Sequence, residues 1–258
     1  YTEIISAPAR SVDPSISAKT FRVIESPGSD SVFRYLDTNS SRADIDVVSN
    51  KLKGKRIAII GLGGTGSYVL DLVAKTPVEE IHMFDGDRFF SHNAFRSPGA
   101  AALETLKGQP LKVDYLKEIY SNMHSGIIVH PEYFYAGDIP SFEGFDFVFV
   151  CIDRGSVKRP LIERLENQDI PFIDVGIGVE LVDDHLIASV RTTTSTPGKR
   201  EHIRSKGRFS LGGDNIGGEY DTNIQIAELN ALNAALAVIK WKKLSGFYQD
   251  VAGEHHSV

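Results

Sequence analysis

The chain has 258 residues, 41% of them hydrophobic and 24% charged, a composition that excludes wholesale disorder and collagen-like repeats. No apolar run approaches the roughly 20 residues of a membrane-spanning helix, so no membrane partner is expected. The net charge of −6 argues against a surface built to attract polyanions. The single cysteine, Cys151, excludes an intrachain disulfide and indicates a reducing compartment, so we expect a cytoplasmic protein.

Residues 1–54 are predicted to form an N-terminal extension with a helix that packs on the core. This segment is rich in Ser, Pro and Asp, and residues 21–24 are its only strand-like run. Ser41 and Asp44 fit the pattern of a helix cap, and apolar residues at helical spacing follow them. We therefore expect a short helix over about 42–53. The sequence does not begin with Met, so we also expect that an upstream piece was removed or left out.

The rest of the chain, residues 55–258, is predicted to form one α/β domain. Short apolar runs of the kind found in buried parallel strands are 56–60, 81–84, 126–129, 145–150 and 171–175. Helical patterns alternate with them over 65–75, 113–120 and 158–168. This alternation predicts a Rossmann-like, mostly parallel sheet with helices on both faces. A further run, 186–194, follows the preceding strand directly, which predicts antiparallel strands towards the C-terminal part.

The C-terminal third contains a long loop and one clear helix. Residues 195–222 lack periodicity and are rich in glycine, which is typical of a functional loop. Residues 223–244 are predicted to form the last helix. Asn223 and Gln225 come at its start, and we assign them no role. His82 alternates with apolar residues in a strand, so we expect it to be structural.

A glycine-rich loop joins the first strand of the domain to its first helix and satisfies the pattern G-x-G-x-x-G. Its candidate nucleotide-binding residues are Gly61, Gly63, Gly64, Thr65 and Gly66. Small residues let the backbone approach a phosphate, and the helix N-terminus supplies N–H groups. Asp85 ends the second strand, where a carboxylate can accept the hydroxyls of a ribose. The loop therefore predicts a nucleotide site, but it does not separate NAD from ATP.

Polar residues beyond Asp85 favour ATP. Asp87 is followed by Asn93 and Arg96, which would balance polyphosphate charge as pyrophosphate leaves. Four motifs occur together: GLGGTGS at 61–67, FDGDRFFSHNAFR at 84–96, GQPLK at 108–112 and FVCID at 149–153. On these motifs, over about residues 55–240, the chain resembles the ThiF/MoeB/HesA superfamily, the adenylating domain shared with ubiquitin-activating enzymes.

The resemblance implies an adenylyltransferase that uses ATP and Mg²⁺. Asp85 would hold the ribose, Asn93, Arg96 and Lys112 would surround the triphosphate, and Asp153 would hold Mg²⁺. Asp87 completes the candidate nucleotide-binding set.

Two features depart from the pattern of the superfamily. Ser97 replaces the usual Gln, and the GQPLK stretch is one residue longer than usual, which leaves Lys107 as the alternative to Lys112. The independent case for Asp153 is that it follows a central parallel strand, whose carboxyl end faces the crevice where ligands bind. The alternative is that Asp153 caps the next helix.

The resemblance also implies partners. The substrate would be the C-terminus of a ubiquitin-like or sulfur-carrier protein, and the chain would form a homodimer in which Arg34 or Arg42 reaches the partner's site. Many relatives carry a later cysteine for a thioester and cysteine pairs for zinc, and this sequence has neither, so no zinc is expected. We expect Cys151, in an apolar strand, to be an inert core thiol. The acyl group would then pass to a thiol or an amine on another protein.

Three alternatives stay open. One is a tRNA-modifying dehydratase of the same superfamily, which would use the basic residues Lys199, Arg200, His202, Arg204, Lys206 and Arg208. Another is a non-catalytic partner subunit of an activating heterodimer. An NAD-dependent oxidoreductase ranks last, because no hydride-transfer constellation accompanies the glycine loop.

Overall fold

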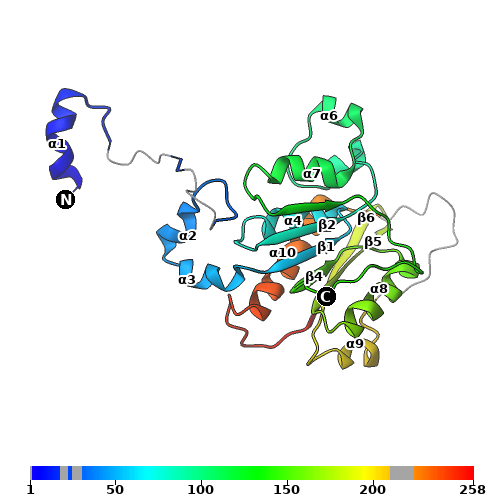
Figure 1. The fold of residues 1–258 in the computed structure, drawn as a ribbon. Coiled ribbons are helices and arrows are strands. Elements are labelled where there is room, and N and C mark those ends of the chain that lie inside the picture. Colours follow the sequence, from blue (N-terminus) through cyan, green and yellow to red (C-terminus); the bar gives the residue numbers. More distant parts are fainter. Residues whose placement is uncertain (1, 18–22, 25–30, 210–223) are drawn as a thin grey trace.

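A computed structural model describes residues 2–17, 23–24, 31–209 and 224–258 (Figure 1). Within these ranges a seven-stranded sheet has the order β3-β2-β1-β4-β5-β6-β7. The strands are β1 (Arg56–Ile60), β2 (Glu80–Phe84), β3 (Ile127–His130), β4 (Phe147–Val150), β5 (Phe172–Val182), β6 (His185–Ser195) and β7 (His256–Ser257). Strands β1 to β5 pair in parallel, whereas β6 and β7 are antiparallel to their neighbours, so the predicted fold class is confirmed.

Helices cover both faces of the sheet. The larger ones are α4 (Gly64–Val73), α7 (Lys112–Tyr120), α8 (Gly155–Asn167) and α10 (Ala227–Leu244). In β1, Ile57 and Ile59 face a core shared with α4, α7 and α10, while Ala58 and Ile60 face a second core shared with α8. Because both faces of such a parallel strand are buried, nearly all of its residues are apolar, and its sequence is an unbroken apolar run. No helix in the described part of the chain is long and apolar enough to cross a membrane.

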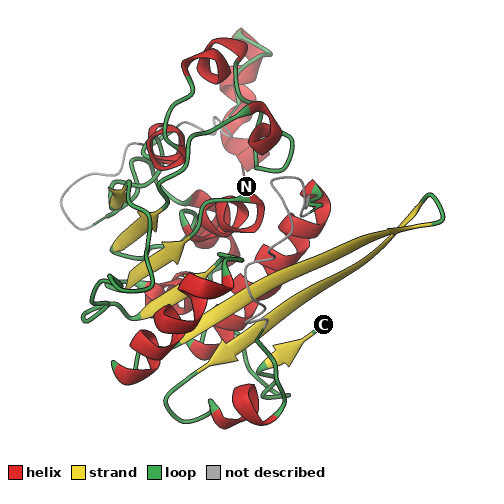
Figure 2. Cartoon of the chain, turned by 90° about the vertical axis from the view of Figure 1, so that its right-hand side faces the viewer, coloured by secondary structure: helices red, strands yellow, loops and turns green. Residues whose placement is uncertain are grey.

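Strands β5 and β6 form a long hairpin that extends beyond the rest of the sheet (Figure 2). The prediction ended the first of these strands at residue 175, whereas β5 runs to Val182. The turn consists of Asp183 and Asp184, with φ angles of 47° and 62°. Positive φ at both turn residues is the geometry of a type I′ hairpin. This Asp-Asp turn lacks the glycine that usually signals such a hairpin, and the outer half of β5 is exposed even though it carries apolar residues such as Leu181 and Val182.

The N-terminal region departs from the predicted helix over 42–53. Three short helices replace it: α2 (Thr38–Ala43), α3 (Asp46–Ser49) and the 3-10 helix η1 (Asn50–Leu52). The cap prediction for Ser41 and Asp44 is wrong. Asp37 caps α2 by accepting from the backbone N–H groups of residues 39 and 40, each at 3.0 Å. Asp44 instead ends α2 in the left-handed conformation, with a φ of 55°.

The remaining elements are short. They are α1 (Thr2–Val12), α5 (Ser91–Ala94), α6 (Leu103–Gly108) and α9 (Glu201–Ser205). Helix α9 lies inside the segment 195–222, which was predicted to be entirely loop. Residues 210–223, which include Asn223 and the later part of the predicted loop, lie outside the described residues, as does part of the run 21–24. His82 is a buried strand residue, as expected, and its ring contacts His130 and Glu80.

Candidate nucleotide-binding site

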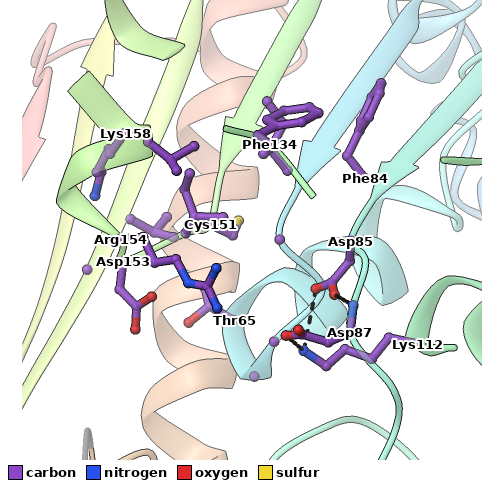
Figure 3. A pocket seen from close by; sticks show the side chains of 18 of the residues that line it. Thr65, Phe84, Asp85, Asp87, Lys112, Phe134, Cys151, Asp153, Arg154 and Lys158 are labelled. Atoms are coloured by element: carbon purple, nitrogen blue, oxygen red, sulfur yellow. Dashed lines mark hydrogen bonds and ion pairs between the residues drawn. The ribbon is translucent and has the colours of Figure 1, made fainter. Parts of the chain in front are cut away.

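A cavity of about 380 Å³ opens at the carboxyl ends of the parallel strands (Figure 3). This edge is where ligands bind in open α/β sheets. Nine of the candidate residues line it: Gly61, Gly63, Gly64, Thr65, Asp85, Asp87, Arg96, Lys112 and Asp153. Two candidates, Gly66 and Asn93, do not. The fold therefore brings together side chains that are up to 92 positions apart in the sequence.

The glycine loop packs too tightly for larger residues. Gly61 has a φ of 88°, and its N–H donates to the carbonyl of Phe84 at 2.9 Å. A Cβ on Gly66 would lie 1.9 Å from the carbonyl oxygen of Gly61, so this glycine serves the approach of α4 to β1. A Cβ on Gly64 would lie 2.2 Å from the side chain of Asn230. The loop therefore delivers the N-terminus of α4 to the cavity, where its N–H groups can meet an anion.

Asp85 ties this loop to the end of β2. One carboxylate oxygen accepts the N–H of Leu62 at 2.7 Å, and the other accepts the N–H of Asp87 at 2.8 Å. The side chain is 8% exposed, and Lys112 Nζ lies 3.5 Å away. A carboxylate has about four lone-pair sites, so two acceptor positions remain for a ligand.

Asp87 is the centre of a hydrogen-bond network at one side of the cavity. Its Oδ2 accepts from Lys112 Nζ at 2.6 Å, and its Oδ1 accepts from the hydroxyl of Tyr133 at 2.8 Å. Partial burial acts to raise the pKa of Asp87, but the hydrogen bonds from Lys112 and Tyr133 outweigh it and hold the pKa below its usual value. Lys112 is buried in the cavity wall, whereas Lys107 is exposed on α6 and does not line the cavity.

Arg96 and Asp153 provide opposite charges across the same cavity. Burial lowers the pKa of the Arg96 guanidinium, and the charges of Asp153 and Asp87 oppose this shift. Asp153 lies just beyond the end of β4. Asp153 is followed by Arg154, which is the N-cap residue of α8 and makes no side-chain cap hydrogen bond.

Asn93 is buried and has a local hydrogen bond. Its Oδ1 accepts the N–H of Phe90 at 2.9 Å at the start of α5. The backbone N–H of Arg96 donates to the carbonyl of Asn93 at 3.1 Å. Asn93 thus shapes the short turn from which Arg96 projects.

Cys151 lies one residue past the end of β4, in the cavity wall, rather than within the strand as expected. It is partly exposed. Burial, reinforced by the charge of Asp174, raises the pKa of its thiol. A thiol with a raised pKa carries little thiolate, which is the reactive form.

Sequence reasoning missed several residues in the cavity wall. Those with polar side chains are Glu132, Tyr133, Arg154, Lys158, Arg191, Gln225 and Asn230. Asn230 accepts a hydrogen bond from the Thr65 hydroxyl at 2.8 Å and so joins α10 to the glycine loop. One signal was present: Asp174 is an ionisable residue inside an apolar strand run, and it pairs with Lys158 and Arg191.

The structure is similar to solved structures of MccB and PaaA. MccB of E. coli with ATP superposes with a TM-score of 0.61 at 18% identity, over 84% of this chain and 66% of MccB. MccB with MccA-N7isoASN has a TM-score of 0.64 at 17% identity and covers 84% and 67%. PaaA has a TM-score of 0.61 at 16% identity and covers 96% and 78%. At these identities the likeness shows the fold.

Curated relatives match part of the chain. Ubiquitin-like modifier-activating enzyme 5 of Culex quinquefasciatus is 22% identical over 147 residues, which cover 53% of this chain and 37% of that enzyme. The tRNA threonylcarbamoyladenosine dehydratase of Bacillus subtilis (strain 168) is 29% identical over 128 residues, which cover 47% and 48%. The chain thus spans less than half the length of these relatives.

Two family models match the chain. Residues 1–38 match a domain of unknown function, DUF6791. Residues 37–181, more than half of the chain, match the model of the ThiF family. The chain therefore belongs to the ThiF family.

Proposed function

We propose that this chain catalyses the ATP-dependent adenylation of the C-terminal carboxylate of a protein or peptide. The observation that carries the proposal is the convergence in one cavity of a glycine loop at a helix N-terminus, a strand-end carboxylate and two cations, Arg96 and Lys112. Membership of the ThiF family and the likeness to MccB, solved with ATP, support the same reaction class.

The proposed reaction needs positioning and charge stabilisation more than proton transfer. A carboxylate oxygen attacks the α-phosphorus of ATP, and the bond from that phosphorus to the β-phosphate oxygen breaks. The products are an acyl-adenylate and pyrophosphate. Arg96 and Lys112 would stabilise the charge that develops on the leaving pyrophosphate. Asp85 would accept the ribose hydroxyls through its remaining lone pairs.

The acidic residues of the cavity fit a magnesium ion. Mg²⁺ prefers one or two carboxylates together with phosphate oxygens and water, and Asp153 supplies a carboxylate in the cavity wall close enough to Arg96 to influence its pKa. In the described part of the chain no three His, Cys, Asp or Glu side chains group to hold a metal by themselves, so the nucleotide would complete the coordination. The ion would neutralise charge on the phosphates.

Asn93 would act mainly by ordering the backbone that carries Arg96, rather than by contacting ATP. Its hydrogen bond to the N–H of Phe90 orders α5, and its carbonyl accepts from the N–H of Arg96. We therefore assign it the positioning of Arg96, with any direct contact to the triphosphate left to experiment.

The acyl substrate would be a ubiquitin-like or sulfur-carrier C-terminus. Support comes from a curated relative that is named a ubiquitin-like modifier-activating enzyme and from MccB, which has been solved with AMPCPP and MccA. The raised pKa of Cys151 makes this thiol a poor acceptor, so a thiol or an amine on another protein would receive the acyl group. We also propose a homodimer in which Arg34 or Arg42, neither of which lines the cavity of its own chain, reaches the partner's site.

The match to a tRNA dehydratase keeps that activity as the second candidate. Most of the basic residues that this activity would use already pair with other residues of the same chain. Arg204 pairs with Glu166, Arg200 pairs with Asp169 at 3.3 Å, and Arg208 donates to His202. Cations that are already paired attract phosphates less, so we rank this candidate second.

An ATP–pyrophosphate exchange assay with a panel of ubiquitin-like and sulfur-carrier C-termini tests the proposal. Exchange should depend on the acyl protein and on Mg²⁺, and Asp153→Ala should abolish it. Exchange with none of the panel, together with unchanged ATP binding by Asp153→Ala, would contradict the proposal. Salt-sensitive tRNA binding would favour the dehydratase. ATP binding with turnover only after addition of a second protein would favour a partner subunit.

A further inference from the structure

Three charged side chains form a cluster in the half of the cavity that the family motifs do not explain. Asp174 of β5 is completely buried, and its two oxygens pair with Lys158 Nζ at 2.5 Å and with Arg191 Nη1 at 2.8 Å. The side chains of Lys158 and Arg191 are 3% and 18% exposed, and both line the cavity. The cluster thus combines a fully buried carboxylate with two cations that face the cavity.

The charges in this cluster do not balance. Two cations share a single carboxylate, which leaves an excess of one positive charge at a poorly solvated site. Such a charge is costly unless an anion compensates it. Asp85 and Asp87, which also line the cavity, are paired with Lys112, and the other acidic residues of the cavity wall are Glu132 and Asp153. An anionic group that enters the cavity would supply the missing negative charge.

The backbone is adapted to hold this arrangement. Gly176 lies opposite Arg191 in the pairing of β5 with β6, and a Cβ there would lie 2.7 Å from Arg191 Nη2. The glycine therefore lets the guanidinium fold back over β5 to reach Asp174. The carbonyl of Arg208 also accepts from Arg191 Nη1, at 2.6 Å. The guanidinium is fixed in place before any ligand binds.

The position of the cluster in the sheet separates it from the nucleotide residues. Asp85, the glycine loop and Asp153 follow β2, β1 and β4, whereas Asp174 and Arg191 belong to β5 and β6. Strand β6, which carries Arg191, is three strands from β1, so the backbones of these two strands are about 14 Å apart. Figure 3 shows Lys158 and Lys112 on opposite sides of Cys151. ATP placed on the glycine loop, Asp85 and Lys112 would leave the half of the cavity beside Lys158, where Asp153 also lies, to the second substrate.

From these observations we infer that Lys158 and Arg191, held by Asp174 and Gly176, form a carboxylate subsite for the end of the acyl substrate. The inference rests on the proposed adenylation. A carboxylate and an α-phosphate repel one another, and cations beside the carboxylate reduce that repulsion while the two groups are brought into contact. Lys158 and Arg191 would touch the substrate, and Asp174 would position them.

The inference is tested by measuring how tightly the protein binds a short peptide that ends in a free carboxylate. The probes are N-acetyl-glycylglycine, which ends in a carboxylate, and its C-terminal amide, which does not. Each is added to the full chain in the presence of α,β-methylene-ATP and Mg²⁺. The dissociation constant of each probe is measured by ligand-observed NMR. The wild type should bind the acid at least fivefold more tightly than the amide. In Lys158→Met and in Arg191→Met this preference should fall below twofold, while affinity for the nucleotide stays within threefold of wild type.

The two variants are designed to keep the fold. Each leaves Asp174 with one cation, so the buried charges balance, and thermal unfolding checks that the proteins are folded. Gly176→Ala should weaken the acid preference without removing a charge, because it displaces Arg191 from Asp174. Arg159→Met is the matched control, since Arg159 is the exposed neighbour of Lys158 on α8 and does not line this cavity.

The outcomes separate this inference from the proposed function. Equal binding of acid and amide by the wild type would overturn the subsite. A tenfold loss of nucleotide affinity in Lys158→Met with an unchanged acid preference would also overturn it and assign the cation to a phosphate. An acid preference that depends on both cations, without any pyrophosphate exchange, would uphold the subsite and refute adenylation.

Discussion

The Nζ of Lys112 lies 2.6 Å from Oδ2 of Asp87 and so joins the first residue of α7 to the turn after β2. The backbone makes the same connection, because the N–H of Lys112 donates to the carbonyl of Asp87 at 2.9 Å. Helix α6 ends at Gly108, and Gln109 follows with a φ of 46°. The chain turns at this left-handed residue between α6 and α7, and Lys112 lies in the cavity wall.

Replacing Lys112 with Met should weaken ATP binding by about 10- to 100-fold. A charge-assisted hydrogen bond contributes about 1.5–3 kcal/mol, and the variant also leaves Asp87 as an uncompensated negative charge beside the phosphates. Isothermal titration with ATP and Mg²⁺ measures the loss. The matched control is Lys107→Met, because Lys107 is exposed on α6. A larger loss from the Lys107 variant would reverse the assignment of the two lysines.

Asn93→Ala should lower the free energy of unfolding by about 1 kcal/mol, the usual cost of losing a side-chain cap. ATP affinity should fall several-fold, because the turn that carries Arg96 loosens. Asn93→Asp keeps the oxygen that accepts from Phe90 and should restore the stability. Urea denaturation and ATP titration of both variants check this. If Asn93→Ala binds ATP more than 100-fold more weakly while its free energy of unfolding is unchanged, the amide contacts the triphosphate directly.

The parallel part of the sheet was predictable because its strands are buried on both faces and appear as uninterrupted apolar runs. Lys112, Arg96 and Asp153 were predictable because each lies in a local motif. The cluster of Lys158, Asp174 and Arg191 was not, because its members come from three elements that only the tertiary structure brings together.

Short polar segments account for the other errors. The N-terminal helix was misplaced because several Ser and Asp residues can cap a helix there; Asp37 caps the start of α2, and Asp44 ends it with a positive φ. The first strand of the hairpin was predicted too short: its outer part carries apolar residues such as Leu181 and Val182, but these are solvent-exposed instead of buried.

Removing magnesium should weaken ATP binding by the wild type but have little effect on Asp153→Asn. The carboxylate of Asp153 would help to hold the ion, and its conversion to an amide removes the negative charge that attracts the cation. Titrations in Mg²⁺ and in EDTA measure the ratio of the two dissociation constants for each protein. The same ratio in wild type and variant would show that Asp153 does not contribute to the metal site.

Gly64→Ala should destabilise the protein by about 1–3 kcal/mol, because the added methyl would overlap the amide of Asn230. Asn230→Ala should cost a similar amount, since the buried hydroxyl of Thr65 loses its partner. The double variant should lose less than the sum of the two. Gly63→Ala is the control, because a Cβ there meets no atom within 4 Å. Additive losses would show that α10 does not constrain the loop through this contact.

Stability should fall as the pH drops below about 6.5, in part because of His124. This residue is completely buried, its Nε2–H donates to the carbonyl of Val78 at 3.0 Å, and its Nδ1 accepts the N–H of Gly126 at 3.1 Å. Burial lowers its pKa. The unfolded chain therefore takes up the proton first, at a pKa near 6.5, and the free energy of unfolding falls from that pH until the folded-state pKa is passed.

His124→Gln retains a donor towards Val78 but does not titrate. It should be about 1–2 kcal/mol less stable than wild type at pH 8, with a smaller loss between pH 8 and pH 5. Urea denaturation at both pH values measures the two differences. His185→Gln, in the exposed hairpin, is the control and should follow the wild-type profile. If the His124 variant loses as much stability on acidification as the wild type does, the pH dependence arises from the other histidines whose pKa values burial lowers, such as His130 and His255.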